Sequence, residues 1–288
     1  MTRTPVVSVV MSVLNGATTV AAAVQSLQLQ TLQDWELIVI DNGSVDESGS
    51  IISGFDDARI RLIREGADAE LATRLNQGVT LSRGKFVARM DADDVCFPQR
   101  LELQVARLEQ DCQLDLVGCG AAVFTNSGQL IGKLPLRITH AEITARPFRG
   151  FPLPHPTWCG RREWFLNNPY DPQAAAAEDQ DLLLRTFRTS TFASLDSVLF
   201  CYRQNRLSLR KLLSGRRAFA GSLWRFGLKS GEFLSPAQGI ATHVLKGTAD
   251  IAAICLGMNG LAQKYRLEPI SPLIRQQWQD LQEQLASE

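Results

Sequence analysis

The sequence predicts an α/β fold with a Rossmann-like, mostly parallel sheet that carries helices on both faces, followed by a helical C-terminal extension. Three observations support this prediction. Short apolar runs rich in β-branched residues alternate with segments of helical apolar spacing in the first third of the chain. Three of the first four apolar runs end in a polar cluster. After residue 206 the pattern changes to long helical segments.

The first third should contain four strands joined by helices. The apolar runs show no polar alternation, which is typical of strands covered on both faces. The expected strands cover residues 6–13, 35–40, 60–63 and 86–90, and the expected helices 17–29, 46–53 and 71–81. We expect Gly84 to provide a left-handed exit turn after the third helix, because glycine lacks a Cβ. Strand and helix in alternation require right-handed crossovers and a parallel sheet.

The polar clusters at the strand ends predict a ligand site. They cover residues 12–15, 41–44 and 91–94. In parallel α/β sheets, ligands bind beyond the carboxyl ends of the strands, where the loops converge. We therefore expect these three clusters to share one crevice.

The rest of the chain is less regular. A helix over 98–110 should begin with Pro98 in its first turn. Further on, we expect strands at 116–124 and 198–202, a hairpin partner at 129–134, and helices near 161–166, 178–188, 209–228 and 237–256. These patterns divide the chain into an α/β domain, residues 1–206, and a helical C-terminal subdomain, residues 207–288.

Composition excludes several classes of partner. The 288 residues contain 30 lysines and arginines and 30 aspartates and glutamates, so no net field favours nucleic acid. The six cysteines form no CxxC pair and stand mostly in apolar surroundings, which favours buried reduced thiols over disulfides or zinc. The apolar stretch near the start is too short for a signal peptide. We therefore expect a cytoplasmic protein.

The apolar segment 237–256 leaves its role open. His243, Lys246 and Asp250 interrupt it, which argues against a membrane span and favours an amphipathic helix. Its apolar face could pack on the core, meet a partner, or contact a lipid surface. The last option would place the protein peripherally on the cytoplasmic face of the membrane.

The strongest chemical feature is Asp91-Ala92-Asp93-Asp94 at the end of a buried strand. Three carboxylates so close together repel one another, and a cation would compensate this repulsion. Magnesium and manganese prefer carboxylates together with water and substrate phosphate. The motif therefore predicts a metal-diphosphate site. The alternative is a solvated acidic turn that caps the next helix.

A second feature is Asp41-Asn42-Gly43-Ser44. An aspartate at a strand end can accept the imide N–H of a uracil or thymine ring, and Gly43 permits a turn that brings the backbone close to a ligand. The alternative is an ordinary strand-to-helix turn closed by an aspartate side chain.

The order of several motifs resembles the family 2 inverting glycosyltransferases with the GT-A fold, especially those of bacterial polysaccharide assembly. The similarity runs from residue 6 to about residue 206. It is carried by VSVV at 7–10 with NG at 15–16, QTLQDWELIVIDNGSVD at 30–46, LNQG at 75–78, GKFVARMDADD at 84–94, PQRL at 98–101 and EDQDLLLR at 178–185. One departure is Ser12-Val13-Leu14-Asn15, where the family more usually has Pro-Thr-Tyr-Asn.

The resemblance implies a nucleotide-diphosphate sugar donor, with UDP as the expected nucleotide, and a hydroxyl of a saccharide or lipid-linked molecule as acceptor. Asp41 would read the base, Asp91 would bind the ribose or the metal shell, and Asp93 would hold Mn²⁺ or Mg²⁺. The other residues expected to bind the nucleotide sugar are Ser12, Asn15, Asn76 and Ala92.

An inverting transfer also requires a base that removes the proton of the attacking hydroxyl. By resemblance this base is Asp179, with Asp181 as its competitor; two residues apart on a helix, they should point in different directions. Helix N-terminal acids can also simply interact with the helix dipole. Residues with weaker expectations of a site role are His155, Glu178 and Arg203. Arg206 could neutralise phosphate together with Arg203.

Other functional classes fit less well. A nucleotidyltransferase should have a basic, glycine-rich phosphate loop after the first strand, and a dehydrogenase should have GxGxxG there, whereas residues 15–18 read Asn-Gly-Ala-Thr. A catalytically inactive nucleotide-sugar or carbohydrate-binding protein of the same fold remains the alternative, although both acidic motifs are intact.

Overall fold

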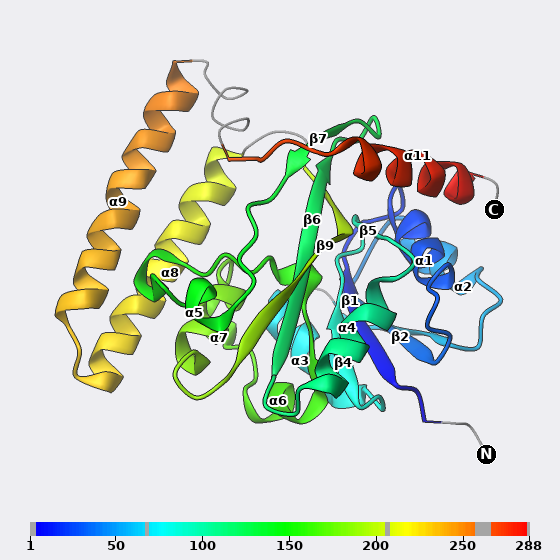
Figure 1. Ribbon diagram of the computed structural model, residues 1–288, viewed down its shortest axis with the longest axis horizontal. Helices are drawn as coiled ribbons and strands as arrows, with labels where there is room; N and C mark the ends of the chain where they lie inside the picture. Colours follow the sequence, from blue (N-terminus) through cyan, green and yellow to red (C-terminus); the bar gives the residue numbers. More distant parts are fainter. Residues whose placement is uncertain (1–3, 67–68, 205–207, 257–265, 287–288) are drawn as a thin grey trace.

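The computed structural model describes residues 4–66, 69–204, 208–256 and 266–286. One mixed sheet runs through the molecule, in the order β3-β2-β1-β4-β8-β6-β9-β5, and β7 pairs with β6. Two long helices lie side by side at one end, and the last helix crosses the opposite end (Figure 1).

The first half of the sheet is parallel. It comprises β1 (Val7–Val13), β2 (Trp35–Asp41), β3 (Ile60–Arg64) and β4 (Phe86–Arg89). Its pairs β1–β2, β1–β4 and β2–β3 are parallel, so all four carboxyl ends face the same edge. Every residue of β2 and β4 is buried, as expected for strands covered on both faces. The four strands expected from the sequence are confirmed.

The second half of the sheet is mixed. β8 (Cys159–Arg161) pairs antiparallel with β4 and with β6 (Leu116–Phe124). β9 (Phe192–Arg203) runs parallel to β6. The short β5 (Val95–Cys96) pairs antiparallel with β9. β7 (Leu130–Lys133) is the expected hairpin partner of β6. The parallel arrangement inferred from the first third therefore does not extend across the whole sheet, and β9 begins six residues before the expected strand at 198.

Helices cover both faces. α1 (Val20–Gln28), α2 (Ser48–Ser53) and α4 (Arg100–Gln110) contribute to one apolar cluster, and α3 (Leu71–Leu81), α6 (Arg162–Asn167) and α7 (Glu178–Thr186) to another. α5 (His140–Ile143) and the short 3-10 turns Pro147–Arg149, His155–Thr157 and Pro172–Ala174 complete this part. The layered α/β architecture is as the sequence predicts.

Two glycines allow the α3 region to approach the sheet. A Cβ on Gly78 would lie 2.4 Å from Val10 Cγ1, and one on Gly84 would lie 2.6 Å from the Ser8 backbone nitrogen. The expected left-handed turn at Gly84 is wrong, because the residues with positive φ in the described chain do not include it. Gly84 is instead required by close backbone packing.

The C-terminal extension is helical, as expected. α8 (Leu209–Ser230) and α9 (Leu234–Cys255) form a hairpin whose turn contains Gly231 at φ 74°. α11 (Pro272–Ala286) returns to the sheet, where the Trp278 ring lies 4.7 Å from that of Phe124. None of the described helices is long and apolar enough to cross a bilayer. The boundary predicted between residues 206 and 207, and Arg206 itself, lie outside the described residues.

The cysteines match the expectation only in part. All six are free thiols, and four are buried: Cys96, Cys119, Cys159 and Cys201. Cys112 and Cys255 are exposed, because the first follows the end of α4 and the second ends α9.

Candidate active site

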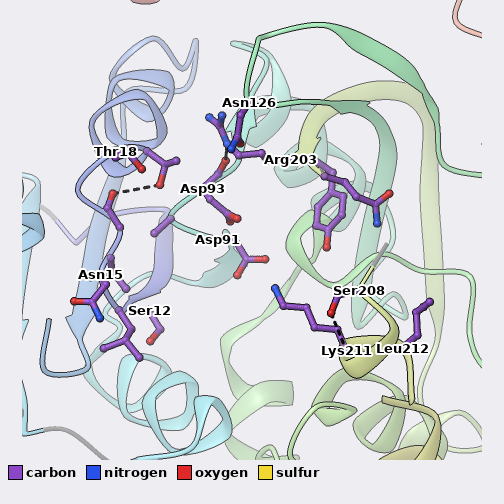
Figure 2. Close-up of a pocket in the computed structure, with 17 residues that line it drawn as sticks. Ser12, Asn15, Thr18, Asp91, Asp93, Asn126, Arg203, Ser208, Lys211 and Leu212 are labelled. Atoms are coloured by element: carbon purple, nitrogen blue, oxygen red, sulfur yellow. Dashed lines mark hydrogen bonds between the residues drawn. The ribbon is translucent and has the colours of Figure 1, made fainter. Parts of the chain in front are cut away.

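A polar cavity of about 680 Å³ lies at the carboxyl ends of β1 and β4. The loop after β1, the acidic loop after β4, the end of β9 and the start of α8 form its walls (Figure 2). We call it the crevice. It is lined by Ser12, Val13, Leu14, Asn15, Gly16, Thr18, Thr19, Asp91, Ala92, Asp93, Asn126, Tyr202, Arg203, Gln204, Ser208, Lys211 and Leu212.

Three aspartates cluster in the loop that follows β4. Asp91, Asp93 and Asp94 each offer an oxygen, and these oxygens all lie within 4.8 Å of one another. Arg89 at the end of β4 forms an ion pair with Asp91. Asp94 is fully buried; its Oδ1 accepts a 2.7 Å hydrogen bond from the Arg203 backbone N–H, whereas its Oδ2 has no hydrogen-bond partner.

The electrostatics of this cluster favour a bound cation. Burial, together with the charge of Asp91, raises the pKa of Asp93. Burial and the charges of Asp91 and Asp93 raise the pKa of Asp94 well above its usual range. Raised pKa values show that these carboxylates have too little positive charge near them. A buried carboxylate oxygen without a hydrogen-bond partner also lowers the stability of the fold. Oxygen ligands at this spacing fit Mg²⁺ or Mn²⁺.

Arg203 holds the acidic loop against β9. Its Nε donates a 2.6 Å hydrogen bond to the Asp93 carbonyl, and its guanidinium lies 4.5 Å from the Phe124 ring centroid. The sequence suggested that Arg203 neutralises phosphate. The structure places it in the crevice wall, where its Nε–H and its backbone N–H position the loop.

The loops after β1 and β2 are locked together. Asn15 adopts a φ of 53°; its N–H donates to Ser44 Oγ at 3.0 Å, and its Oδ1 accepts from the Val45 N–H at 3.0 Å. Asp41 is 5% exposed, and one of its carboxylate oxygens accepts the Ser44 N–H at 2.9 Å. Ser12, Asn15 and Ala92 line the crevice, whereas Asp41, the last residue of β2, does not.

A smaller cavity of about 330 Å³ adjoins the crevice and shares Asp91 and Tyr202 with it. Asp179, in the first turn of α7, lines this second cavity together with Arg89 and His155. Burial raises the pKa of Asp179, and its Oδ2 accepts a 3.1 Å hydrogen bond from Gln180 Nε2. The structure therefore brings Asp179 to the edge of the acidic site.

The other two acids of the Glu-Asp segment have different surroundings. Asp181 is 3% exposed and forms ion pairs with Arg185 of the same helix (2.7 Å) and with Arg225 (3.3 Å). The second pair links α7 to α8. Glu178 is also buried, and its Oε1 accepts the Ala176 N–H at 3.1 Å. Neither residue lines the crevice or the adjoining cavity.

His155 and Asn76 converge on Tyr170. His155 Nε2 lies 2.8 Å from the Tyr170 hydroxyl, and burial together with the nearby Arg89 charge lowers the pKa of the imidazole well below its usual value. Asn76 Nδ2 donates to the Tyr170 carbonyl at 2.8 Å, and its Oδ1 accepts the Tyr170 N–H at 2.9 Å. The Asn76 side chain is thus occupied in bracing the backbone, and it does not line the crevice as the sequence suggested.

Three further residues of the site were missed from the sequence: Arg89, Tyr202 and Lys211. Arg89 is buried and pairs with Asp91. Lys211 extends from the first turn of α8 into the crevice and points toward Asp91 (Figure 2). A buried arginine two residues before the acidic motif was a readable signal, because buried cations are almost always paired. Lys211 carried no such signal, since it stands in a segment with many basic residues.

Comparisons with known proteins agree with this geometry. EpsE of Bacillus subtilis is 34% identical over 160 residues, which are 54% of this chain and 56% of that protein. The uncharacterized glycosyltransferase EpsJ of the same organism is 30% identical over 223 residues, 72% of this chain and 64% of that protein. This chain thus spans less than two thirds of either relative.

The fold is also that of a solved structure. Residues 1–349 of S. aureus TarS, in complex with UDP-GlcNAc, superpose with a TM-score of 0.61 at 15% identity, covering 96% of this chain and 79% of that one. The arrangement is the GT-A fold. The model of the family described as "Glycosyl transferase family 2" matches residues 8–167, more than half of the sequence. The chain belongs to glycosyl transferase family 2.

Proposed function

We propose that the protein is a metal-dependent inverting glycosyltransferase, which moves a sugar from a nucleotide-diphosphate donor to an acceptor hydroxyl. The observation that supports this most directly is the adjacency of two sites. Asp91 and Asp93 line the crevice with the buried Asp94 close to them, and Asp179 borders a cavity that shares Asp91 and Tyr202 with the crevice. One site suits a departing diphosphate and the other suits an attacking hydroxyl.

The crevice accounts for donor binding. Asp41 pairs in register with Val13, which lines the crevice, and its second carboxylate oxygen would accept the imide N–H of uracil. The contact between Asn15 and Ser44 keeps the two adjoining loops in place. UDP is the proposed nucleotide. A relative from Escherichia coli, 29% identical over 139 residues, is named as a UDP-Glc:alpha-D-GlcNAc-diphosphoundecaprenol beta-1,3-glucosyltransferase.

The acidic cluster accounts for leaving-group stabilisation. Asp93, with Asp91 and the unpartnered Oδ2 of Asp94, would hold Mn²⁺ or Mg²⁺ against the donor diphosphate. A metal ion bound there supplies positive charge that stabilises the leaving diphosphate. Lys211 adds a mobile cation from the opposite wall. Arg89 neutralises part of the Asp91 charge and keeps this carboxylate oriented.

Asp179 accounts for activation of the acceptor. Its carboxylate would accept the proton of the acceptor hydroxyl as that oxygen attacks the anomeric carbon from the side opposite the diphosphate. Its raised pKa makes it a stronger base than an ordinary aspartate. Gln180, which donates to Asp179 Oδ2, fixes the direction of the carboxylate. Direct displacement of this kind inverts the anomeric configuration.

Polysaccharide assembly is the proposed context. The Escherichia coli relative WbnJ, 29% identical over 211 residues, is named as an O-antigen biosynthesis glycosyltransferase. The acceptor is accordingly proposed to be a saccharide, free or lipid-linked.

The metal role is tested with Asp93→Asn. UDP-, GDP- and dTDP-sugars are first compared by thermal shift with Mn²⁺, since a ligand that binds the folded state raises Tm. We expect a shift with a UDP-sugar, and loss of at least about 10³-fold in metal-dependent sugar transfer in the variant, because the charge of the leaving group is no longer balanced.

Asp196→Asn is the matched control, because Asp196 is an exposed aspartate in β9 that lines none of these cavities. Transfer by Asp93→Asn at the rate of this control would refute the metal site. Binding of a UDP-sugar without any transfer by the parent protein would favour a binding protein over an enzyme.

A further inference from the structure

A third cavity lies between the helical hairpin and the loop before β8. It has a volume of about 1160 Å³ and is bounded by α5, the turn Pro147–Arg149, α8 and α9. We call it the basic cavity. It shares Lys211 and Leu212 with the crevice, so the two cavities meet at the start of α8.

The side chains that line this cavity carry a large excess of positive charge. Seven cationic side chains line it, against the single carboxylate of Glu142. Two of the seven, Arg216 and Arg266, form ion pairs with Asp250 behind the wall. Among the described residues, no salt bridge engages the cations Arg146, Arg149, Lys211 or Lys246. Partial burial, together with the neighbouring cations Arg216, Arg149 and Arg266, lowers the pKa of Lys246 against the opposing effect of Asp250, as expected where positive charges outnumber negative ones.

A buried histidine provides an independent sign of a polar ligand. His243 lines the basic cavity and is 8% exposed, yet neither of its ring nitrogens has a hydrogen-bond partner among the described residues. Its ring packs edge-on against Phe219, with centroids 5.1 Å apart. Burial and the charges of Lys246 and Arg216 lower its pKa to about 4, so the imidazole is neutral near pH 7 and offers one donor and one acceptor. Unpartnered buried polar groups of this kind are uncommon in folded proteins.

The basic cavity is connected to the proposed base. Gln180 lines it, and the same side chain donates to Asp179 Oδ2 at 3.1 Å and accepts the Phe151 N–H at 2.7 Å. A ligand in the basic cavity therefore lies beside the residue that holds Asp179. The donor side of Asp179 is the cavity shared with Asp91.

We propose that the basic cavity binds a phosphate ester carried by the acceptor, with Arg149 and Lys246 as its main anion-binding residues and His243 as a partner for an adjacent hydroxyl. This inference rests on the proposed function, because it assigns the acceptor class of that reaction. The acceptor is thus a phosphorylated saccharide, held on one side of Asp179 while the donor sugar is presented from the other. Its phosphate supplies negative charge to the cations of the cavity that form no salt bridge among the described residues, Arg149 and Lys246 among them.

Binding is measured by titration calorimetry with butyl diphosphate in EDTA, which removes the metal ion that would hold a diphosphate in the crevice. We expect Arg149→Gln/Lys246→Gln to weaken this binding at least about tenfold, because charge-assisted hydrogen bonds are lost. Both side chains are exposed, so the substitutions do not disturb the core. Arg217→Gln is the matched control: Arg217 is exposed on α8 and does not line the cavity. Equal affinity of the double variant and the control would overturn the proposal.

A second measurement separates an acceptor phosphate from a free one. Butyl diphosphate should raise the acceptor KM in transfer assays without changing the donor KM, and the double variant should raise the acceptor KM while its affinity for UDP stays that of the parent. Inorganic phosphate that binds the cavity without affecting the acceptor KM would overturn the acceptor role. Absence of any UDP-sugar binding or transfer by the parent would instead refute the proposed function, independently of the calorimetry.

Discussion

The two walls of the active site are built in different ways. The donor wall is the carboxyl edge of β1, β2 and β4, and its polar residues are tied to one another through short contacts such as Asn15 to Ser44 and Arg89 to Asp91. The proposed acceptor wall consists of α7, α8, α9 and the turn Pro147–Arg149, with long basic side chains, many of them exposed and without an ion pair in the described chain. The family model covers the first wall and ends at residue 167, so it includes the turn that carries Arg149 but none of α7, α8 and α9.

This difference indicates a division of labour. A preorganised edge suits a chemically constant group such as a nucleoside diphosphate with its metal, because fixed dipoles and charges need not rearrange during reaction. Long basic side chains that form no salt bridge suit the negatively charged acceptor proposed above. We therefore expect substitutions in the two walls to differ in their effects on kcat, on Tm and on substrate affinity.

The largest effect should come from Asp179→Asn, at the junction of the two walls. Loss of the base should reduce kcat by about 10²- to 10⁴-fold, while affinity for the UDP-sugar remains near that of the parent. Because the pKa of Asp179 is raised, transfer by the parent should fall with decreasing pH from a higher pH than an ordinary aspartate would give. Steady-state rates over a pH series check both points. Full transfer by the variant would move the base to another residue.

Asp181→Asn should lower the stability of the protein without changing kcat. Asp181 forms ion pairs with Arg185 and Arg225 and thereby joins α7 to α8. Removing its charge leaves Arg185 without a counter-ion and leaves Arg225 with only its 3.9 Å contact to Asp171. We expect a cost of about 1–3 kcal/mol in the free energy of unfolding, reduced by the partial exposure of both arginines. Thermal denaturation should show a lower Tm, and kcat below this Tm should remain close to that of the parent. A loss of kcat at unchanged Tm would instead indicate that Asp181, and not Asp179, is the base.

The sequence predicted the donor wall better than the acceptor wall, for physical reasons. β1, β2 and β4 are buried on both faces, so their apolar runs and terminal polar residues follow directly from local pattern. The pairing of β6 with β9 joins segments more than seventy residues apart, and local periodicity carries no information about it. Asn76 was misplaced for a related reason: its motif is local, but its partner Tyr170 is distant in sequence. The basic cavity combines residues from five separate segments, 135–152, 176–180, 211–219, 243–246 and Arg266, and was not predicted at all.

The smallest effect should come from Lys211→Gln, where the two walls meet. Lys211 is exposed, lines both the crevice and the basic cavity, and points toward Asp91. One solvent-exposed cation adds about 1 kcal/mol or less to an ionic contact, so donor affinity should fall no more than about tenfold. Equilibrium binding of the UDP-sugar at two salt concentrations measures this, and the loss should shrink at high salt because screening weakens the contact in the parent.

Arg210→Gln is the control for Lys211, because Arg210 is an exposed neighbour on α8 that lines neither cavity. An equal loss in both variants would mean that the hairpin acts only through its overall charge. A loss confined to Lys211→Gln, together with an acceptor effect confined to Arg149 and Lys246, would show that one helix serves both substrates at different positions. A change of residues along α8 and α9 could then alter acceptor choice while the donor wall stays intact, since the contacts that order that wall involve no residue of the hairpin.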